Sequence, residues 1–177
     1  MRRHDVSVLL SASEIRKRLE TLASEIAGHY PKDLMIVSLL RGSFVFTADL
    51  IRELYSLGCH PQIDFMTISS YGNNMTGSDT LTIHRDITED VSGRDVLILD
   101  DILESGRTLF HARELLKERG ANLLKIAVLL EKPGKRVIEI DADFVGFTIP
   151  DKFVVGYGLD YANYYRELPY VGVIEVH

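Results

Sequence analysis

The stretch of sequence that decides the fold runs from residue 96 to residue 109 and reads Val96-Leu97-Ile98-Leu99-Asp100-Asp101-Ile102-Leu103-Glu104-Ser105-Gly106-Arg107-Thr108-Leu109. Four apolar residues of β type end in two carboxylates, and a short polar loop that contains Gly106 then opens into a helical pattern. This order predicts a strand, a binding loop and the N-terminus of a helix. In open α/β sheets, ligands bind beyond the carboxyl ends of the strands, and a helix N-terminus attracts anions.

The loop after this strand has the composition of a phosphate site. Its backbone N–H groups and polar side chains are placed to surround a phosphate: Ser105, Gly106, Arg107 and Thr108. Asp100 and Asp101 repel the same anion, so the ligand must also offer them hydroxyl donors or a metal ion. A sugar phosphate meets both demands. The alternative is an ordinary turn with a capping serine, but such a turn has no need of three carboxylates within five positions.

Length and composition indicate one enzyme-sized domain over residues 1–177. The chain has 177 residues, 46% of them hydrophobic, which suffices for one substantial core. Cys59 is the only cysteine, so no internal disulfide can form and a reducing compartment is expected. The N-terminal segment carries no apolar signal region and no stretch is long enough to span a bilayer, so we expect a cytoplasmic protein without membrane contact. The formal net charge of −6 argues against a nucleic-acid partner.

The rest of the chain alternates between helical and strand patterns. Helices are predicted at 11–28, 43–57 and 108–119, and strands at 34–40, 63–71, 96–103 and 126–130. Short strands at 144–147, 153–157 and 171–176 are expected to complete the sheet, and a polar, glycine-bearing loop covers 71–80. These patterns predict an α/β fold with a mostly parallel sheet, helices on both of its faces, and a small lobe made from the two ends of the chain.

Residues 96–108 resemble the phosphoribosyl-pyrophosphate binding motif of the type I phosphoribosyltransferases. Residues 144–161, from Phe144-Val145-Gly146-Phe147 to Leu159-Asp160-Tyr161, are similar to the purine-binding end of the hypoxanthine-guanine phosphoribosyltransferases. Three further segments match the same family in order and spacing: Leu39-Leu40-Arg41-Gly42-Ser43, Ser69-Ser70-Tyr71-Gly72 and Tyr165-Arg166-Glu167-Leu168. The resemblance covers the chain from about residue 35 to its end and implies the type I phosphoribosyltransferase fold, with its hood lobe.

The resemblance implies roles for the residues around the phosphoribosyl donor. Leu40, Arg41 and Gly42 match a pyrophosphate-binding turn, which in the family contains a non-proline cis peptide bond. Without the resemblance, this segment would pass for a simple turn with a surface arginine. Asp100 and Asp101 match the carboxylates at the ribose hydroxyls and are also candidate Mg²⁺ ligands, and residues 105–108 match the loop that holds the 5′-phosphate. Asp160 matches a magnesium-associated carboxylate and Arg166 a pyrophosphate contact, although either could be a plain surface charge.

A second set of residues matches the part of the family's site that binds the purine. Lys132 matches the lysine that donates to the purine 6-oxygen, against the alternative of an exposed lysine beside a proline. Phe153 matches the ring that stacks on the purine, although a phenylalanine in an apolar strand is by default a core residue. Val154 matches a position that recognises the base edge through its backbone. Ser70 and Tyr71 match residues of a mobile loop, about 71–80, that closes over the pyrophosphate.

Glu104 is the candidate general base. It lies between the ribose carboxylates and the phosphate loop, from where it could share the proton at purine N7 while N9 attacks the ribose. The family usually has aspartate at this position and often glutamate at position 100, whereas this chain has Glu104 and Asp100. The acid chemistry survives both differences, but the longer arm of Glu104 requires the loop to sit back or the side chain to fold.

The resemblance implies Mg²⁺-dependent transfer of a 5-phosphoribosyl group from phosphoribosyl pyrophosphate to hypoxanthine, and to guanine, with a homodimer or homotetramer as the expected assembly. A xanthine-preferring relative is the main alternative. A regulatory protein of the same fold that binds nucleic acid disagrees with the acidic charge balance. A receiver-type signalling domain would carry its paired carboxylates near the N-terminus rather than in mid-chain.

Overall fold

The computed structural model describes residues 5–30, 34–72 and 79–174 of the chain. The elements in chain order are β1 (Val6–Leu10), α1 (Ala12–His29), β2 (Met35–Leu39), α2 (Phe44–Ser56), β3 (Gln62–Gly72), β4 (Asp79–Arg85), β5 (Val96–Leu103), α3 (Arg107–Glu118), β6 (Leu124–Glu131), β7 (Phe144–Thr148), β8 (Val154–Val155) and β9 (Val171–Ile174). Among the described residues, no helix is both long enough and apolar enough to cross a membrane.

The main sheet has six strands in the order β4-β3-β2-β5-β6-β7. Strand β2 pairs in parallel with β3 and β5, β5 with β6, and β6 with β7, whereas β4 is antiparallel to β3. The expected mostly parallel sheet is thereby confirmed. Its parallel strands all point their carboxyl ends toward one edge, which is the edge where α/β sheets bind ligands.

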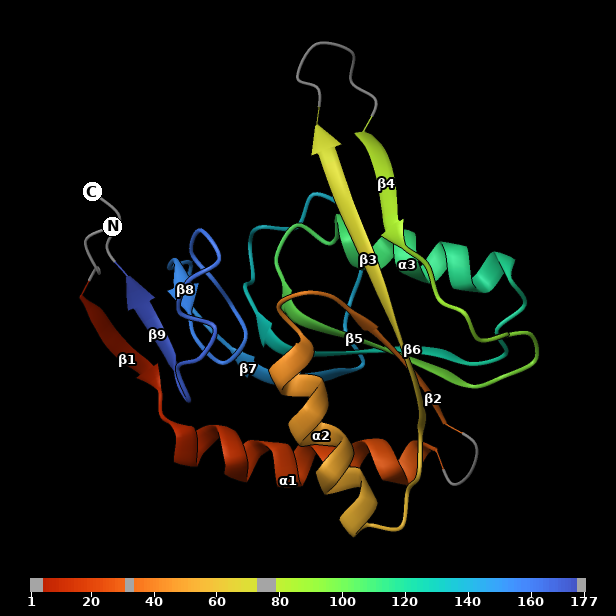
Figure 1. The fold of residues 1–177 in the computed structure, drawn as a ribbon, viewed down its shortest axis with the longest axis horizontal. Coiled ribbons are helices and arrows are strands. Elements are labelled where there is room, and N and C mark those ends of the chain that lie inside the picture. The colour runs from red at the N-terminus through yellow and green to blue at the C-terminus, as the bar shows by residue number, and fades with distance from the viewer. Residues whose placement is uncertain (1–4, 31–33, 73–78, 175–177) are drawn as a thin grey trace.

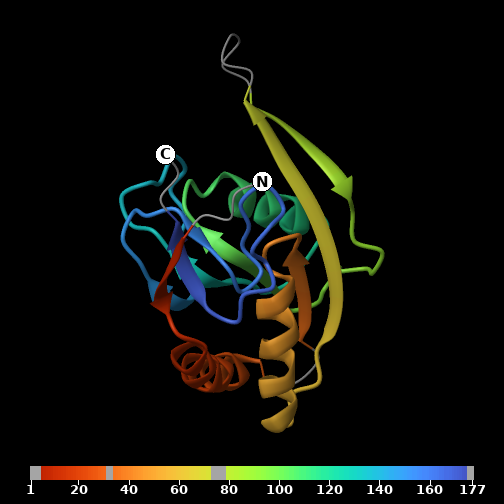
Figure 2. The same ribbon diagram turned by 60° about the vertical axis from the view of Figure 1, so that its left-hand side comes forward.

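Helices cover both faces of this sheet, as Figures 1 and 2 show. On the face of α1 and α2, inward side chains of the central strands, such as Ile36 and Leu99, pack with Leu22 of α1 and Leu50 of α2. On the other face, Val37 and Ile98 belong to a second apolar cluster, which includes three buried residues of α3: Leu109, Ala112 and Leu116. A parallel strand covered on both sides must be apolar at successive positions, which explains the uninterrupted burial of β2.

Helix α1 begins where the sequence predicts a capping box. The side chain of Ser11 accepts a hydrogen bond from the Glu14 N–H at 3.3 Å, and the Glu14 carboxylate accepts one from the Ser11 N–H at 2.8 Å. These two bonds satisfy backbone donors that a helix N-terminus otherwise leaves unpaired. The helix then buries one stripe of apolar residues, including Ile15, Leu19 and Ile26.

The small lobe is a separate antiparallel sheet in the order β1-β9-β8. Val6 pairs with Ile174 and Ser7 with Val173, so strands from opposite ends of the chain lie side by side (Figure 1). The lobe was expected, but its strand content was not. Residues 153–157 and 171–176 were expected to complete the main sheet; this prediction was wrong, because β8 and β9 pair with β1 and with each other.

Strand β4 was not predicted. It pairs with the distal half of β3, from Thr67 to Gly72, and Figure 1 shows the two strands rising above the body of the protein. The backbone of Tyr71 pairs with Thr80 and that of Gly72 with Asp79, so both ends of the expected loop 71–80 belong to strands. The remainder of that loop lies outside the described residues.

Candidate active site

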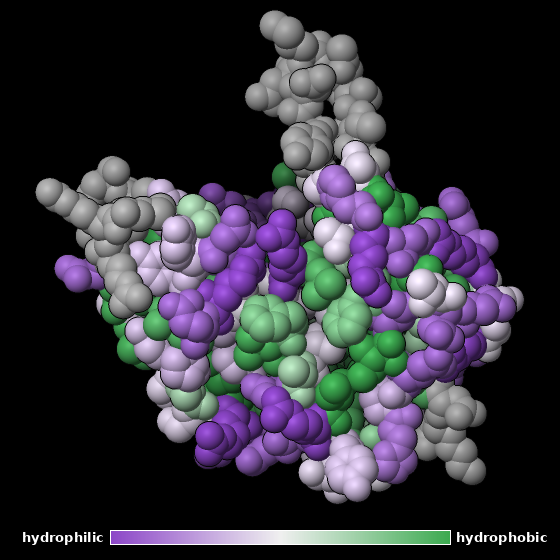
Figure 3. Space-filling model, in the orientation of Figure 1, coloured by the Kyte–Doolittle hydropathy of each residue, from purple (hydrophilic) through white to green (hydrophobic). Residues whose placement is uncertain are grey.

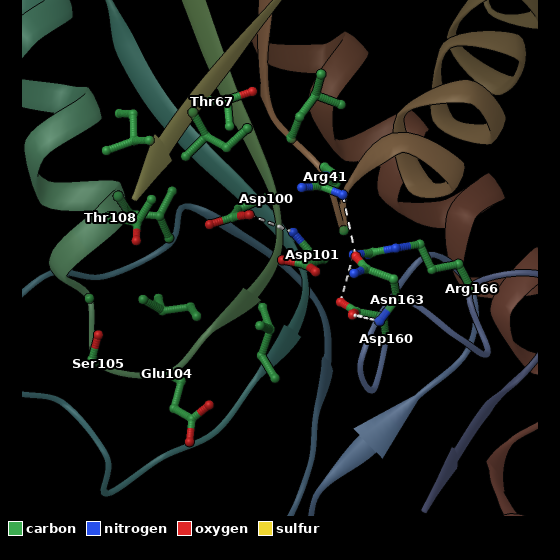
Figure 4. Close-up of a pocket in the computed structure, with 18 residues that line it drawn as sticks. Arg41, Thr67, Asp100, Asp101, Glu104, Ser105, Thr108, Asp160, Asn163 and Arg166 are labelled. Atoms are coloured by element: carbon green, nitrogen blue, oxygen red, sulfur yellow. Dashed lines mark hydrogen bonds and ion pairs between the residues drawn. The ribbon is translucent and has the colours of Figure 1, made fainter. Parts of the chain in front are cut away.

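A cavity of about 530 Å³ opens at the carboxyl ends of β2 and β5. Four segments line it: the turn between β2 and α2, residues 67–68 of β3, the end of β5 with the loop to α3, and the loop that contains Asp160 and Arg166. Figure 4 shows Asp100 and Asp101 in the middle, with Ser105 and Thr108 on one side and the Asp160–Arg166 loop on the other.

The acidic pair sits in the last half of β5. Asp100 has only 9% of its surface exposed, and its Oδ1 accepts a hydrogen bond from the Asp101 N–H at 3.0 Å. Burial, together with the charge of Asp101, raises the pKa of Asp100 well above its usual range. Burial also raises the pKa of Asp101, although the nearby Arg166 works in the opposite direction. Two neighbouring carboxyls of this kind, one buried and one partly buried, favour a ligand that brings positive charge or hydroxyl donors.

The loop between β5 and α3 is held in place from behind. The Ser105 carbonyl accepts hydrogen bonds from the N–H groups of Val137, at 2.9 Å, and Ile138, at 3.1 Å. Gly106 precedes α3 with a φ of +82°, and a Cβ there would lie 2.8 Å from the Ile138 carbonyl oxygen. Glycine is therefore required both by the left-handed backbone and by the close packing. The loop presents the N-terminus of α3 to the cavity, as the sequence predicts for an anion site.

The turn between β2 and α2 approaches Asp101 very closely. The peptide bond between Leu40 and Arg41 is cis, as the family resemblance implies. The Leu40 N–H donates to the Met66 carbonyl at 2.8 Å, which ties the turn to β3. At Gly42 a Cβ would lie 1.5 Å from Oδ2 of Asp101, so only glycine allows the present position of that carboxylate.

Three buried hydroxyls fix the same turn to the sheet. Ser43 donates to the Leu39 carbonyl at 2.5 Å, and Ser38 lies 2.7 Å from both the Ser43 and the Thr47 hydroxyl oxygens. Each hydroxyl has one proton and the carbonyl can only accept, so the chain of donors must run from Thr47 to Ser38, then to Ser43, and finally to Leu39. This network links the end of β2 with the first turn of α2.

The fourth wall of the cavity carries paired charges. Arg166 forms an ion pair with Asp160 at 2.7 Å and donates to the Gly158 carbonyl at 2.6 Å. The other oxygen of the Asp160 carboxylate accepts from the Asn163 N–H at 2.7 Å. The Asn163 side chain in turn accepts from Arg41 at 3.3 Å (Figure 4), so this wall contacts the turn after β2.

Lys132 and Glu104 mark one end of the site. Lys132 is 6% exposed, which argues against the reading of an exposed surface lysine, and its Nζ lies 3.6 Å from Oε2 of Glu104. Phe153 is 48% exposed and stands edge-on to Tyr161, so it is not the core residue that its type alone would suggest. Val154 is buried in β8.

The cavity brings together most of the residues that the sequence singled out. Its lining includes Leu40, Arg41, Gly42, Asp100, Asp101, Glu104, Ser105, Gly106, Thr108, Asp160 and Arg166. Lys132, Phe153, Val154 and Arg107 are not part of that lining, although Lys132 reaches Glu104 and Arg107 is the first residue of α3. The side chains of Ser70 and Tyr71 lie outside the described part of the structure.

Sequence reasoning missed some residues of the cavity, notably Thr67 of β3 and Asn163. Neither has a side chain that indicates catalysis, and Thr67 precedes the matched segment Ser69–Gly72 by two positions. A threonine in a strand carries no sequence signal that separates a cavity wall from an ordinary sheet position. Asn163 lies in a tight turn in which Ala162, Asn163 and Tyr165 have positive φ values of 52°, 67° and 76°, a backbone conformation that no motif in this stretch of sequence announces.

Comparison with known proteins agrees with these features. A family model described as phosphoribosyl transferase domain matches residues 5–162. The chain is 45% identical to a hypoxanthine phosphoribosyltransferase of Escherichia coli over 97% of both chains, and 45% identical to a hypoxanthine-guanine phosphoribosyltransferase of Bacillus subtilis over 99% of this chain and 97% of the relative. The crystal structure of a hypoxanthine phosphoribosyltransferase from Staphylococcus aureus superimposes with a TM-score of 0.88 at 42% identity, covering 96% of this chain and 91% of that one.

Proposed function

We propose that this chain, which belongs to the phosphoribosyltransferase family, transfers the 5-phosphoribosyl group of phosphoribosyl pyrophosphate to hypoxanthine, forming IMP and releasing pyrophosphate in purine salvage. Guanine is the expected second substrate, giving GMP. The observation that carries the proposal is the position of the acidic pair, the buried Asp100 and the partly buried Asp101, between the N-terminus of α3 and the arginines Arg41 and Arg166. A phosphorylated ribose with a pyrophosphate group matches each of these parts.

The donor would lie across the cavity, from the N-terminus of α3 past Asp100 and Asp101 to Arg41 and Arg166. Its 5′-phosphate would bind at residues 105–108, beside the N-terminus of α3, where Ser105, Gly106 and Thr108 line the cavity and the Arg107 N–H, now 3.4 Å from the Ser105 hydroxyl oxygen, could turn to the anion. Its ribose hydroxyls would donate to Asp100 and Asp101, and its pyrophosphate would contact Arg41 and Arg166.

The acidic residues fit a magnesium ion that is held mainly by the donor. Mg²⁺ prefers oxygen ligands and is usually bound by one or two carboxylates together with substrate phosphates. Asp160, Asp100 and Asp101 supply such oxygens, and within the described ranges no three His, Cys, Asp or Glu side chains form a closed metal cage. When bound, Mg²⁺ supplies positive charge that offsets the charge of the departing pyrophosphate.

The purine would occupy the end of the site near Lys132 and Glu104. The Lys132 ammonium would donate to the 6-oxygen of the base, Phe153 would stack on its ring, and the backbone at Val154 would recognise its edge. Glu104 would take or share the proton near N7 while N9 attacks the anomeric carbon. The ribose then develops positive charge and the leaving oxygens negative charge, which Arg41 and Arg166 stabilise.

The expected loop closure belongs to the same proposal. Water would capture a cation-like ribose, so the site must exclude it during transfer. Ser70 and Tyr71 sit at the far end of β3, on the hairpin that rises above the cavity-bearing body (Figure 1). We expect hydrogen exchange over residues 72–80 to slow when the donor and a non-reactive purine analogue are added.

Purine selectivity provides the direct test. The purified enzyme is assayed with Mg²⁺, phosphoribosyl pyrophosphate and hypoxanthine, guanine, xanthine or adenine in turn. Hypoxanthine should be turned over well and adenine poorly, because the 6-amino group of adenine would place a donor against the Lys132 ammonium. Adenine used as fast as hypoxanthine would refute the assignment, and a preference for xanthine would identify the related activity instead.

We also expect the chain to form a homodimer or homotetramer. A groove of about 840 Å³ lies between α1, α2 and residues 166–169, with Phe44, Val45 and Leu19 among its lining, and Phe44 is 44% exposed. Figure 3 shows apolar surface gathered on the face that carries α2. Light scattering combined with size-exclusion chromatography measures the assembly directly.

A further inference from the structure

Arg136 lies in the segment between β6 and β7, and its guanidinium group contacts backbone carbonyls of two loops. Its Nη1 atom lies 3.0 Å from the Leu103 carbonyl oxygen, 2.8 Å from that of Glu104 and 3.4 Å from that of Lys132. Its Nε donates to the Ile140 carbonyl at 3.2 Å, and its Nη2 pairs with the Glu131 carboxylate at 2.5 Å.

The two loops that Arg136 joins carry the two polar side chains at the purine end of the site. One nitrogen atom of Arg136 lies within hydrogen-bond distance of the backbone carbonyls of both Glu104 and Lys132. The side chains of these residues leave the backbone toward each other, with 3.6 Å between the Lys132 Nζ and the Glu104 Oε2. The distance between them therefore depends on how the two loops are joined.

We propose that Arg136 is a positioning residue that fixes Glu104 and Lys132 relative to each other and thereby sets the affinity for the purine base. The inference rests on the proposed function, because that function assigns the base to these two residues. Arg136 itself does not line the cavity, and its guanidinium is only partly exposed. It acts through the backbone of the residues that would touch the substrate.

Arginine suits this position because of its geometry. A guanidinium group offers five N–H donors in one plane; here Nε reaches one carbonyl, Nη2 the carboxylate, and the two N–H groups of Nη1 are shared among three carbonyls. A lysine has the same charge but only one nitrogen, so it could not reach both loops and Glu131 together. The Glu131 carboxylate offsets the charge of Arg136, whose side chain is 21% exposed, so the guanidinium is not left unpaired in a poorly hydrated place.

The donor end of the site is supported by other contacts. The Ser105 carbonyl is held by backbone N–H groups of Val137 and Ile138, and Asp100 and Asp101 belong to the ladder of β5. None of these contacts passes through the Arg136 side chain. A change at Arg136 should therefore weaken the binding of the purine base and leave the binding of the donor unchanged.

Arg136→Lys tests the inference by steady-state kinetics with hypoxanthine and donor varied separately. We expect the KM for hypoxanthine to rise about tenfold, the loss expected from one hydrogen bond to a charged group, with the KM for the donor within about twofold of wild type. Arg119→Lys is the matched control, because Arg119 makes two hydrogen bonds to the Asp86 carboxylate, at 2.7 and 2.6 Å, away from the cavity. It should leave both KM values unchanged while disturbing an equally well-formed ion pair.

Glu131→Gln provides a second variant should Arg136→Lys fold poorly. It retains the arginine and removes its charged partner, so the KM for hypoxanthine should rise by a smaller factor. If the KM for hypoxanthine stays within about twofold of wild type in the folded variants, or if both KM values rise equally, the inference is wrong.

Hydrogen exchange separates this inference from the proposed function. The Lys132 N–H donates to the Leu103 carbonyl at 3.0 Å, so its exchange reports how firmly the two loops are joined. Exchange at Lys132 should become faster in Arg136→Lys but not in Arg119→Lys, whether or not the enzyme uses hypoxanthine. Absence of turnover by the wild type would refute the proposed function alone, whereas unchanged exchange at Lys132 would refute the joining role of Arg136.

Discussion

Gly42→Ala should move a single carboxylate in the site without disturbing the fold. A Cβ at position 42 would lie 1.5 Å from Oδ2 of Asp101 and 2.5 Å from its Cγ, while ordinary contact begins at 3.4 Å. The carboxylate must therefore withdraw by about 2 Å. The atoms in the way belong to the end of one side chain rather than to the backbone, so rotation of Asp101 can relieve the collision.

The expected loss is in donor binding. Displacement of a contacting group by about 1 Å can reduce a rate or affinity about 10²-fold, and the carboxylate here must move further than that. We expect the affinity for phosphoribosyl pyrophosphate with Mg²⁺, measured by titration calorimetry, to fall about 10²-fold. The thermal midpoint should change by less than about 4 °C, equivalent to about 1 kcal/mol for a chain of this size.

Two further variants test whether the contact with Asp101 causes the loss of donor affinity. Gly28→Ala is the matched control, because a Cβ there has no neighbour within 4 Å, and alanine should stabilise α1 by up to about 1 kcal/mol without affecting the donor. In an Asp101→Ala background the obstructing oxygen is gone, so Gly42→Ala should add little to the loss already present. Additive losses in the double variant, or wild-type donor affinity in Gly42→Ala, would show that the contact with Asp101 is not the cause.

Three more substitutions test other parts of the molecule. Glu104→Gln keeps the side chain's size but removes its proton acceptance, so kcat should fall by about 10² to 10⁴ with donor affinity unchanged; a kcat within about threefold of wild type would exclude it as the base. Asp64→Asn should lower the free energy of unfolding by about 1–3 kcal/mol, since this carboxylate accepts from backbone N–H groups and from the Thr88 hydroxyl. Burial acts to raise the pKa of Asp64, but these donors lower it on balance. The free energy of unfolding, measured by urea denaturation, should therefore differ fully between wild type and variant above about pH 4. This difference should disappear as the pH falls through the lowered pKa. Ser43→Ala leaves the Leu39 carbonyl without its 2.5 Å donor and should lower both the free energy of unfolding, by about 1–3 kcal/mol, and donor affinity, as urea denaturation and calorimetry would measure; an unchanged donor affinity would separate this turn from the site.

Much of the fold could be predicted because its signals are local. The capping box at Ser11 and Glu14 marks the start of α1, and the apolar runs that become β2 and β5 mark strands covered on both faces. The small sheet could not be predicted in the same way. The strand patterns near residues 153–157 and 171–176 indicate strands but do not indicate partners, and β9 pairs with β1 across nearly the whole length of the chain.

Strand β4 was missed for a different reason. Its sequence from Thr80 to His84 alternates polar and apolar residues, but over only five positions, and Thr82, Ile83, His84 and Arg85 are all exposed. An alternation this short, beside a polar, glycine-bearing segment, is a weak strand signal, and β4 projects from the body in Figure 2 rather than packing into the core. Its pairing comes from backbone hydrogen bonds to β3, which no side-chain pattern records.

The residues of the candidate site likewise fall into two groups, those that sequence motifs reveal and those that they do not. Side chains whose chemistry is needed at the cavity, such as Asp100 and Arg166, stand in motifs that the sequence displays. Arg136 could not be found in that way, because four of its five partners are backbone carbonyls, and any residue provides a carbonyl. Asn163 likewise acts through a local turn and one bond to Arg41.

The pairing of charges at the site explains how an acidic chain can bind a polyanion. Arg166 is paired with Asp160 at 2.7 Å, and the Lys132 Nζ lies 3.6 Å from the Glu104 carboxylate. The positive and negative side chains of these two pairs therefore neutralise one another. A ligand must replace one member of such a pair, because neither pair presents a single charge sign. A simple anion would gain Arg166 but face Asp160, whereas a donor that brings phosphates, hydroxyls and a divalent cation can satisfy both signs at once. We therefore expect the donor without Mg²⁺ to bind far more weakly than the donor with it, which titration in the presence of a chelator would measure.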